Sequence, residues 1–228
     1  MFKFSQIHPG IFHLEFKDKI ELTAHFLRAQ EFYESPKFQG KSFQLMDFIM
    51  WYIKEGRPDE DGKDIFSYFD DWGGFNIPAE VILQCHAGIT DMNDYDRFLH
   101  IIAKKALTYA PKAYIIGTSE CHSSAISHEI AHGLFYTNDE YKTKALELID
   151  KTPQDLITSI KEALVNMGYA ESVLDDETQA YMSTGLCESI QESIENVERV
   201  VKTQIPFIKL FKSYTSYTTR KTAKLSIQ

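Results

Sequence analysis

The stretch SAISHEIAHGLFYTNDEYKTKALELI, Ser124–Ile149, contains two histidines four residues apart, His128 and His132, and Glu129 directly follows the first of them. Apolar residues fill most positions around them, a pattern that predicts a buried helix. Residues four apart lie on one face of a helix, about one turn from each other. Both imidazoles could therefore bind the same metal ion.

Glu129 should project close to the same face of this helix. From there it could accept a proton from a metal-bound water without binding the metal itself. The alternative is that His128 and His132 are core histidines, hydrogen-bonded to neighbouring groups. Two histidines and a carboxylate are costly to bury unless something satisfies them, which favours the metal site.

A catalytic zinc site usually has three protein ligands and one open position, so a third ligand is required. Asp139 and Glu140 are close in sequence, but they fall where TNDE is expected to break or restart a helix. Either could bind the metal only if the chain turned back sharply. A ligand from a more distant segment is therefore expected.

Glu177 is the strongest candidate for this third ligand. Asp176 and Gln179 form a helix-start signature, which places Glu177 in the first turn of a helix expected to run from about Asp176 to Thr203. Glu177 would head the buried stripe of that helix, where a carboxylate needs a cation or strong donors. The alternative is a carboxylate that is stabilised only by the helix dipole.

The pair HEIAH and ETQAY, which starts 45 residues after His132, resembles the gluzincins, metallopeptidases with the H-E-x-x-H signature and a glutamate ligand from a second helix. The resemblance covers about residues 112–201. It implies one Zn²⁺ per chain held by His128, His132 and Glu177, with Glu129 as the general base in peptide-bond hydrolysis. It also implies an α+β, predominantly helical, zincin-like domain with a small sheet.

The run KAYIIGTS, Lys112–Ser119, is rich in β-formers and predicts a strand before the motif helix. In the fold of the gluzincins an edge strand runs along the cleft and pairs with an extended peptide. The resemblance therefore implies that Lys112–Ser119 is the edge strand and grips the substrate through backbone hydrogen bonds. A protein or peptide is the expected substrate.

The sequence departs from the thermolysin-like pattern at Tyr181, which stands where those members have an aspartate. A carboxylate that orients a ligand would then have to come from elsewhere, with Asp175 or Asp176 as the candidates. Tyr181 itself has two open roles, as a hydrogen-bond donor to the oxyanion or as a core aromatic. The other tyrosines that could donate to the oxyanion are Tyr136, Tyr141 and Tyr169.

The chain has 228 residues, of which 43% are hydrophobic, enough to form a core without a structural metal. We see no internal repeat or long linker, so a single domain is expected over residues 1–228. It divides into an unassigned part (1–111), a metal-site core (112–203) and a basic C-terminal segment (204–228). Periodicity predicts helices over residues 43–53, 78–86, 94–109 and 152–168, and composition predicts a loop over residues 69–78.

The net charge of -9 is unevenly distributed. Residues 199–228 contain seven Lys or Arg and no Asp or Glu, which leaves a net charge of -16 on residues 1–198. A nucleic-acid-binding surface on the main body is therefore not expected. The basic C-terminal segment could contact an anionic partner or be a solvated tail.

The three cysteines are far apart and form no C-x-x-C pair, which fits a reduced, cytoplasmic chain. The start of the sequence has no signal-peptide pattern, and no stretch approaches 18 apolar residues. Export by a specialised route remains an alternative. Two other functions stay open, a catalytically inactive zincin-fold binding protein and a metal-dependent amidase on a non-peptide substrate, although Glu129 favours an enzyme.

Overall fold

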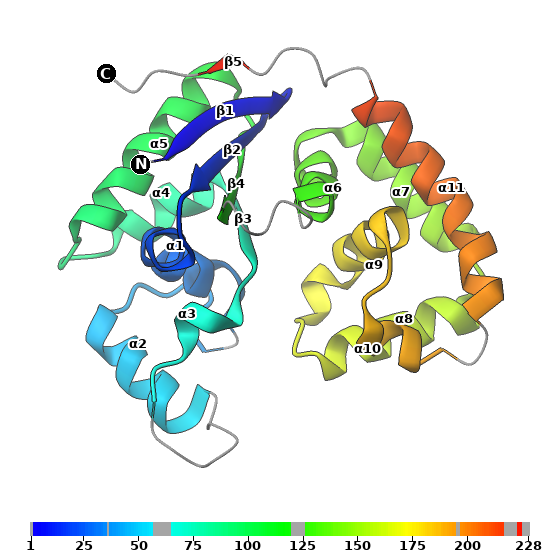
Figure 1. Cartoon of the computed structure of the whole chain (residues 1–228), viewed down its shortest axis with the longest axis horizontal. Helices are drawn as coiled ribbons and strands as arrows, with labels where there is room; N and C mark the ends of the chain where they lie inside the picture. Colours follow the sequence, from blue (N-terminus) through cyan, green and yellow to red (C-terminus); the bar gives the residue numbers. More distant parts are fainter. Residues whose placement is uncertain are drawn as a thin grey trace.

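The computed structural model describes residues 2–35, 37–56, 65–119, 126–194, 197–216 and 223–224. Figure 1 shows two halves side by side, one with the sheet and its helices and the other made of helices alone. The helix that carries the motif, α6 (Ile126–Thr137), packs against the sheet on one side and against α9 (Leu174–Thr184) on the other. The expected α+β class with predominant helix is confirmed.

The remaining elements have the following bounds. The strands are β1 (Lys3–His8), β2 (Ile11–Phe16), β3 (Gly74–Pro78), β4 (Tyr114–Ser119) and the short β5 (Ala223–Lys224). The helices of the sheet half are α1 (Lys19–Glu34), α2 (Leu45–Trp51) with the π-helical turn η1 (Tyr52–Gly56), α3 (Tyr68–Asp71), α4 (Ala79–Ala87) and α5 (Asp94–Tyr109). Those of the helical half are α7 (Asp139–Lys151), α8 (Gln154–Asn166), the 3-10 turn η3 (Glu171–Val173), α10 (Glu188–Glu192) and α11 (Val197–Thr215).

The strand before the motif helix lies inside the sheet, so the prediction that Lys112–Ser119 forms the edge strand is wrong. The strand order is β3-β4-β2-β1-β5, and β4 pairs with β2 in parallel and with β3 in antiparallel orientation. All six residues of β4 are buried. Strands covered on both faces read as continuous apolar runs, which is the pattern of YIIG in β4.

The edge next to β4 is β3, which the sequence predicted as part of a loop. Phe75 and Ile77 alternate into the core below α1, while Asn76 between them points toward α6 and contacts Glu129. Pro78 ends the strand, in keeping with the restriction of proline to edges and strand ends. The paired glycines of this segment lead into a strand and do not form a long loop.

The two faces of the sheet are covered by different helices. Phe12 and Leu14 of β2 pack in a core with α1, α4 and α5, whereas Ile11 belongs to the core formed with α6. α6 approaches closely because it has a glycine at the contact: a Cβ on Gly133 would lie 2.8 Å from Ile11 Cδ1. This contact sets the distance between the motif helix and the sheet.

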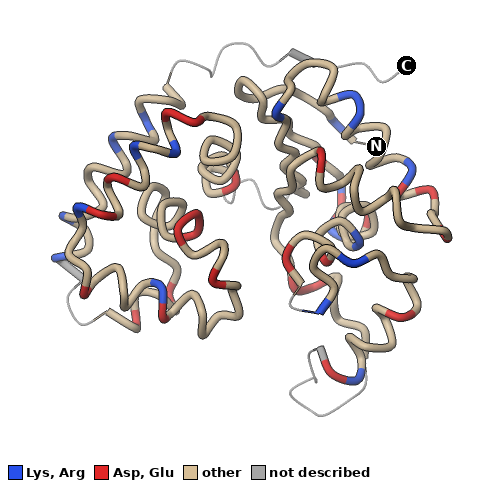
Figure 2. The backbone as a smooth tube through the Cα atoms, turned by 180° about the vertical axis from the view of Figure 1, so that it is seen from behind, with Lys and Arg blue, Asp and Glu red and all other residues tan. Residues whose placement is uncertain are grey.

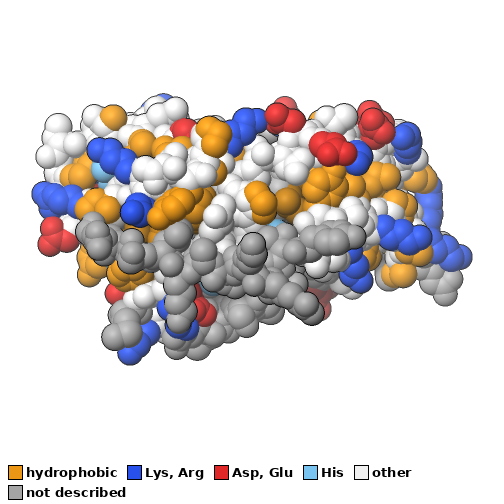
Figure 3. Space-filling view, turned by 90° about the horizontal axis from the view of Figure 1, so that it is seen from above, with side chains coloured by type: hydrophobic (Ala, Val, Ile, Leu, Met, Phe, Trp, Pro, Cys, Tyr) orange, Lys and Arg blue, Asp and Glu red, His pale blue; other side chains and the backbone are white. Residues whose placement is uncertain are grey.

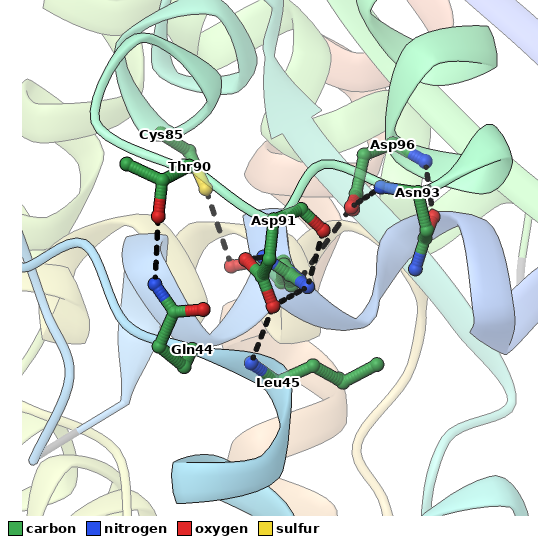
Figure 4. Close-up of polar contacts among 8 residues, drawn as sticks. Gln44, Leu45, Cys85, Thr90, Asp91, Asn93 and Asp96 are labelled. Atoms are coloured by element: carbon green, nitrogen blue, oxygen red, sulfur yellow. Dashed lines mark hydrogen bonds and ion pairs between the residues drawn. The ribbon is translucent and has the colours of Figure 1, made fainter.

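The buried Arg28 ties α1 to α5 and to the loop before it, through Asp91 and Asp96, which Figure 4 labels. Arg28 is 3% exposed, and its Nη1 donates to Asp91 Oδ1 at 2.6 Å. Its Nε lies 3.5 Å from the buried Asp96 Oδ2, which also accepts from the backbone N–H of Asn93. Burial raises the pKa of Asp96, although Asn93 and Arg28 oppose the rise. Arg28 and Asp96 therefore form a buried ion pair in which each side chain compensates the charge of the other.

We expect Arg28→Met to lower the free energy of unfolding by about 3–5 kcal/mol, because Asp96 would remain buried without its cation. This decrease in the free energy of unfolding should be smaller at lower pH, since protonation of Asp96 removes the uncompensated charge. Urea unfolding at two pH values measures this. The control is Arg97→Met on the exposed side of α5, expected to change stability by less than about 1 kcal/mol. Equal effects of both substitutions would contradict the assigned role of Arg28.

Several predicted helices are confirmed, but the long C-terminal one is not. Residues 78–86, 94–109 and 152–168 match α4, α5 and α8 to within two residues at each end. The helix expected from Asp176 to Thr203 is instead divided into α9, α10 and α11. Gly185 ends α9 with a φ of 126°, a conformation that glycine adopts without strain.

Lysines and arginines of the helical half lie mainly on its outer side, away from the sheet (Figure 2). On the face in Figure 3 basic side chains gather toward the two ends, with hydrophobic side chains interspersed between them. Lys209 and Lys212 of the basic C-terminal segment are exposed on α11, and residues 217–222 and 225–228 lie outside the described part. Among the described helices, none combines the length and apolarity needed to span a membrane.

Candidate metal centre

α6 presents both motif histidines on the face turned toward α9. His128 Nε2 and His132 Nε2 are 3.1 Å apart, and His132 is 3% exposed. The opposite side of the helix packs Ala131 and Leu134 against the sheet. This apolar contact fixes which face of α6 turns toward α9, and so keeps both imidazoles on that face. Ser124 and Ala125 of the motif stretch lie outside the described residues.

Glu177 reaches the two histidines from the first turn of α9, as the sequence predicted. Its Oε1 lies 3.6 Å from His132 Nε2, and its Oε2 lies 3.7 Å from His128 Nε2. α9 begins at Leu174, two residues before the predicted start. One ligand atom from each of these three residues lies within 4.8 Å of the other two, and the three residues come from two helices.

The spacing of these donor atoms suits a zinc ion. Ligand atoms at about 2.0–2.1 Å from a tetrahedral zinc are about 3.3 Å from each other. The two Nε2 atoms are 3.1 Å apart, and each has one oxygen of Glu177 at 3.6 or 3.7 Å. Among the described residues, Glu177 Oε2 is buried without a close hydrogen bond, and His128 Nε2 lies 3.7 Å from it. A buried carboxylate oxygen normally has a donor or a cation, so its lone pair is available to a metal.

The electrostatic field at this point favours a cation. Burial alone would lower the pKa of His132, but Asp176 and Glu177 raise it well above its usual value. Burial alone would raise the pKa of Glu177, yet the two histidines hold it below its usual value. The field that attracts a proton to His132 also attracts a metal ion. The residues present therefore fit a zinc centre.

Each histidine is oriented through its second nitrogen. His132 Nδ1 lies 3.0 Å from Asp176 Oδ1, and that oxygen also accepts from Gln179 Nε2 at 2.9 Å. His128 Nδ1 lies 3.3 Å from Thr184 Oγ1. Such contacts fix the ring and leave Nε2 free to bind a metal. Of the two aspartates that the sequence offered for this position, Asp176 contacts a motif histidine, whereas Asp175 pairs with Lys161.

We expect Asp176→Asn to weaken zinc binding by about 10–100-fold, because the amide no longer provides a negative charge to His132 Nδ1. The control is Asp175→Asn, which removes the same charge one residue away from the half-exposed pair with Lys161. Competition with a fluorescent zinc chelator measures both affinities. Equal zinc affinity of the two variants would show that Asp176 does not support the site.

Glu129 is buried next to the donor atoms but is held by a separate set of contacts. Asn76 Nδ2 donates to Glu129 Oε2, and Tyr114 OH donates to Asn76 Oδ1. Burial raises the pKa of Glu129, although His132, His128 and the Asn76 amide oppose the rise. A carboxylate with a raised pKa, fixed next to a metal site, is suited to accept and return a proton.

Tyr181 packs its ring at a tilt against His128 and directs its hydroxyl toward other residues. Its ring centre is 4.5 Å from that of His128, and its hydroxyl interacts with Tyr169 and Cys187. Tyr141 is fully buried and donates to Gln179 at 2.8 Å, which removes it from the candidates for an oxyanion donor. Tyr136 donates to Glu80.

The two other carboxylates considered as ligands lie on the surface. Asp139 pairs with Lys112 and Glu140 with Lys144, both at the start of α7. Neither contacts a motif histidine. The residues around the site that sequence reasoning missed are Asn76, Thr184, Tyr33 and Glu34. Asn76 could have been found from the alternating run GFNIP, while α1, which carries Tyr33 and Glu34, had an ambiguous pattern.

Comparisons with protein-family models, with curated proteins and with solved structures found no match for this chain.

Proposed function

We propose that this protein is a zinc-dependent hydrolase that cleaves peptide bonds. The observation that carries the proposal is the cluster of His128, His132 and Glu177, whose Oε2 has no close hydrogen bond among the described residues, with a second buried carboxylate, Glu129, next to them. A structural zinc site needs a fourth ligand and no adjacent base. Three donors with a separate fixed carboxylate are instead typical of hydrolytic sites.

His128, His132 and Glu177 would hold the metal, and Asp176 would keep His132 in the correct tautomer. When bound, zinc acts as a Lewis acid that polarises a carbonyl and acidifies water. Glu129 accepts a proton from the attacking water at its Oε1 or Oε2 and later returns it to the leaving amine. Asn76 holds this carboxylate in place throughout.

The substrate would lie along β3, the edge strand beside Glu129. A Cβ on Gly74 would be 3.7 Å from Glu129 Oε1, so the backbone of β3 runs directly past the general base. An extended peptide that adds to this edge forms backbone hydrogen bonds and brings its own carbonyls to the metal. The sequence predicted that Lys112–Ser119 pairs with the substrate. We propose that Gly74–Pro78 has this role instead.

The proposal is tested with unfolded casein as substrate. We expect hydrolysis by the zinc-loaded protein, loss of activity after removal of metal with 1,10-phenanthroline, and recovery with Zn²⁺ but not Mg²⁺, because nitrogen ligands favour zinc. The rate of hydrolysis is measured from the newly formed amino groups. If the zinc-loaded protein forms no new amino groups from casein or from a mixed peptide library, the proposed activity is wrong.

A further inference from the structure

A cavity of about 480 Å³ is lined by residues from both halves of the molecule. The sheet half contributes the end of α1, the end of α2 and α3, and the helical half contributes residues 167–170 and Val173. Val173 lines the cavity and lies about one helical turn before Glu177, and Trp72 lines it two residues before Gly74 of β3. The cavity is therefore close in the chain both to the glutamate of the proposed metal site and to the edge strand. Burial, and then the charge of Glu177, raise the pKa of the lining residues Glu34 and Tyr169.

Two glutamates give this cavity a negative character. Glu31 Oε1 accepts from Tyr68 OH at 2.7 Å, and Glu34 Oε2 accepts from Gln30 Nε2 at 2.7 Å. Among the described residues, no Lys, Arg or His forms an ion pair with either glutamate or lines the cavity. Burial and the nearby Glu177 raise the pKa of Glu34 to about 7. Carboxylates buried with neutral partners are stabilised by an incoming cation.

Gln30 supports one of the two glutamates. Its amide nitrogen donates to Glu34 Oε2, and its own Oε1 is buried without a hydrogen-bond partner among the described residues. Because that oxygen has almost no accessible surface, the carboxylates of the wall decide which ligand charge is favoured, and they disfavour an anionic ligand.

Aromatic rings form the remaining wall of the cavity. Trp51, Trp72 and Tyr169 line it together with Tyr52 and Tyr68. Faces of such rings attract ammonium and guanidinium groups. Trp51 already makes this contact, because Lys37 Nζ lies 5.1 Å from its ring centre. Carboxylates and aromatic faces together match a cationic side chain with an apolar stem.

We propose that this cavity binds the side chain of a lysine or arginine in the substrate, close to the bond that is cut. The inference rests on the proposed peptidase function, because it takes the bound side chain to belong to a substrate. Binding of the cationic group can nevertheless be measured without catalysis. The cavity volume lies within the range of ordinary ligand sites. The protein would then favour basic peptides, in keeping with the acidic charge of residues 1–198.

The chain offers a direct reporter, because it has only two tryptophans and both line the cavity. Nα-acetyl-L-arginine amide, Nα-acetyl-L-lysine amide and the neutral Nα-acetyl-L-citrulline amide are titrated into the full-length, zinc-loaded Glu129→Gln protein while tryptophan fluorescence is recorded. We expect saturable changes with the two cations and at least about tenfold weaker binding of citrulline, which has the shape of arginine without its charge.

Charge-removing variants separate the cavity from general electrostatics. Glu34→Gln and Glu31→Gln should each weaken binding of the arginine probe by about tenfold, since each removes one carboxylate from the cavity wall. Glu147→Gln, which removes the same charge from the exposed side of α7, should leave it unchanged. Thermal unfolding verifies that each variant is folded. Equal binding of arginine and citrulline, no saturable change, or equal effects of all three variants would overturn the proposal.

A second arm links the cavity to cleavage and separates the two proposals. Fluorogenic peptides that differ only in Arg, Lys or Gln beside a common cleavage site are compared by kcat/KM with wild-type protein. A preference for Arg and Lys that Glu34→Gln reduces supports both proposals. Cleavage without preference, together with no probe binding, overturns the cavity alone. Probe binding without any cleavage overturns the peptidase function but retains the cation site.

Discussion

Glu129→Gln is expected to lower kcat for peptide hydrolysis by about 10²–10⁴-fold, because the amide cannot accept a proton from the attacking water. The protein should keep its zinc, since the three donor atoms come from His128, His132 and Glu177. Asn76 can still donate to the Gln side-chain oxygen, so the fold around the site should be preserved. Casein hydrolysis and metal content, measured on the same preparation, check both statements.

The matched control is Glu140→Gln at the start of α7. Glu140 is exposed, pairs with Lys144, and loses the same charge on substitution, so its variant should hydrolyse casein at the wild-type rate. A Glu129→Gln protein with nearly full activity would show that another group acts as the base. A variant that had lost its zinc would show that Glu129 is a ligand, which would contradict the separation of roles described above.

Glu177→Ala is expected to weaken zinc binding by more than about 100-fold, because loss of an outer partner alone costs 10–100-fold and Glu177 is a direct donor. Activity should fall with zinc occupancy and recover in part at high zinc concentration. Titration with a competing chelator gives the affinity. Circular dichroism shows whether α9 remains folded, as its contacts with α6 through Ala180 predict.

Glu188→Ala provides the comparison, because Glu188 also lies in the first turn of a helix but is exposed. Both variants lose a helix-start carboxylate and its favourable contact with the helix dipole. Only the Glu177 variant should lose zinc affinity. If both variants bound zinc as the wild type does, Glu177 would be a carboxylate stabilised by its helix, the alternative considered from the sequence.

The parts of the site that depend on local geometry could be predicted from the sequence. The spacing of His128 and His132 fixes their relative position on α6, and the Asp176–Gln179 pair places Glu177 at the start of the second helix. The hydrogen bond between these last two side chains exists, although α9 begins two residues earlier. Local periodicity also predicted α5 to the residue.

The parts that depend on long-range pairing could not be predicted. β4 is an inner strand because β2, about 100 residues earlier in the chain, pairs with it, and no local pattern encodes that partner. The same holds for Asn76, which reaches Glu129 only because β3 pairs with the other side of β4. The end of α9 at Gly185 was missed because the apolar periodicity continues across the glycine.

The zinc content of the wild-type protein tests the central claim most directly. The protein is purified without chelators, equilibrated with a small excess of Zn²⁺, desalted and analysed by mass spectrometry of the metal, beside the Glu177→Ala variant. We predict about one zinc per wild-type chain and strongly reduced zinc occupancy in the Glu177→Ala variant. A wild-type protein without bound zinc, or a variant with full occupancy, would contradict it.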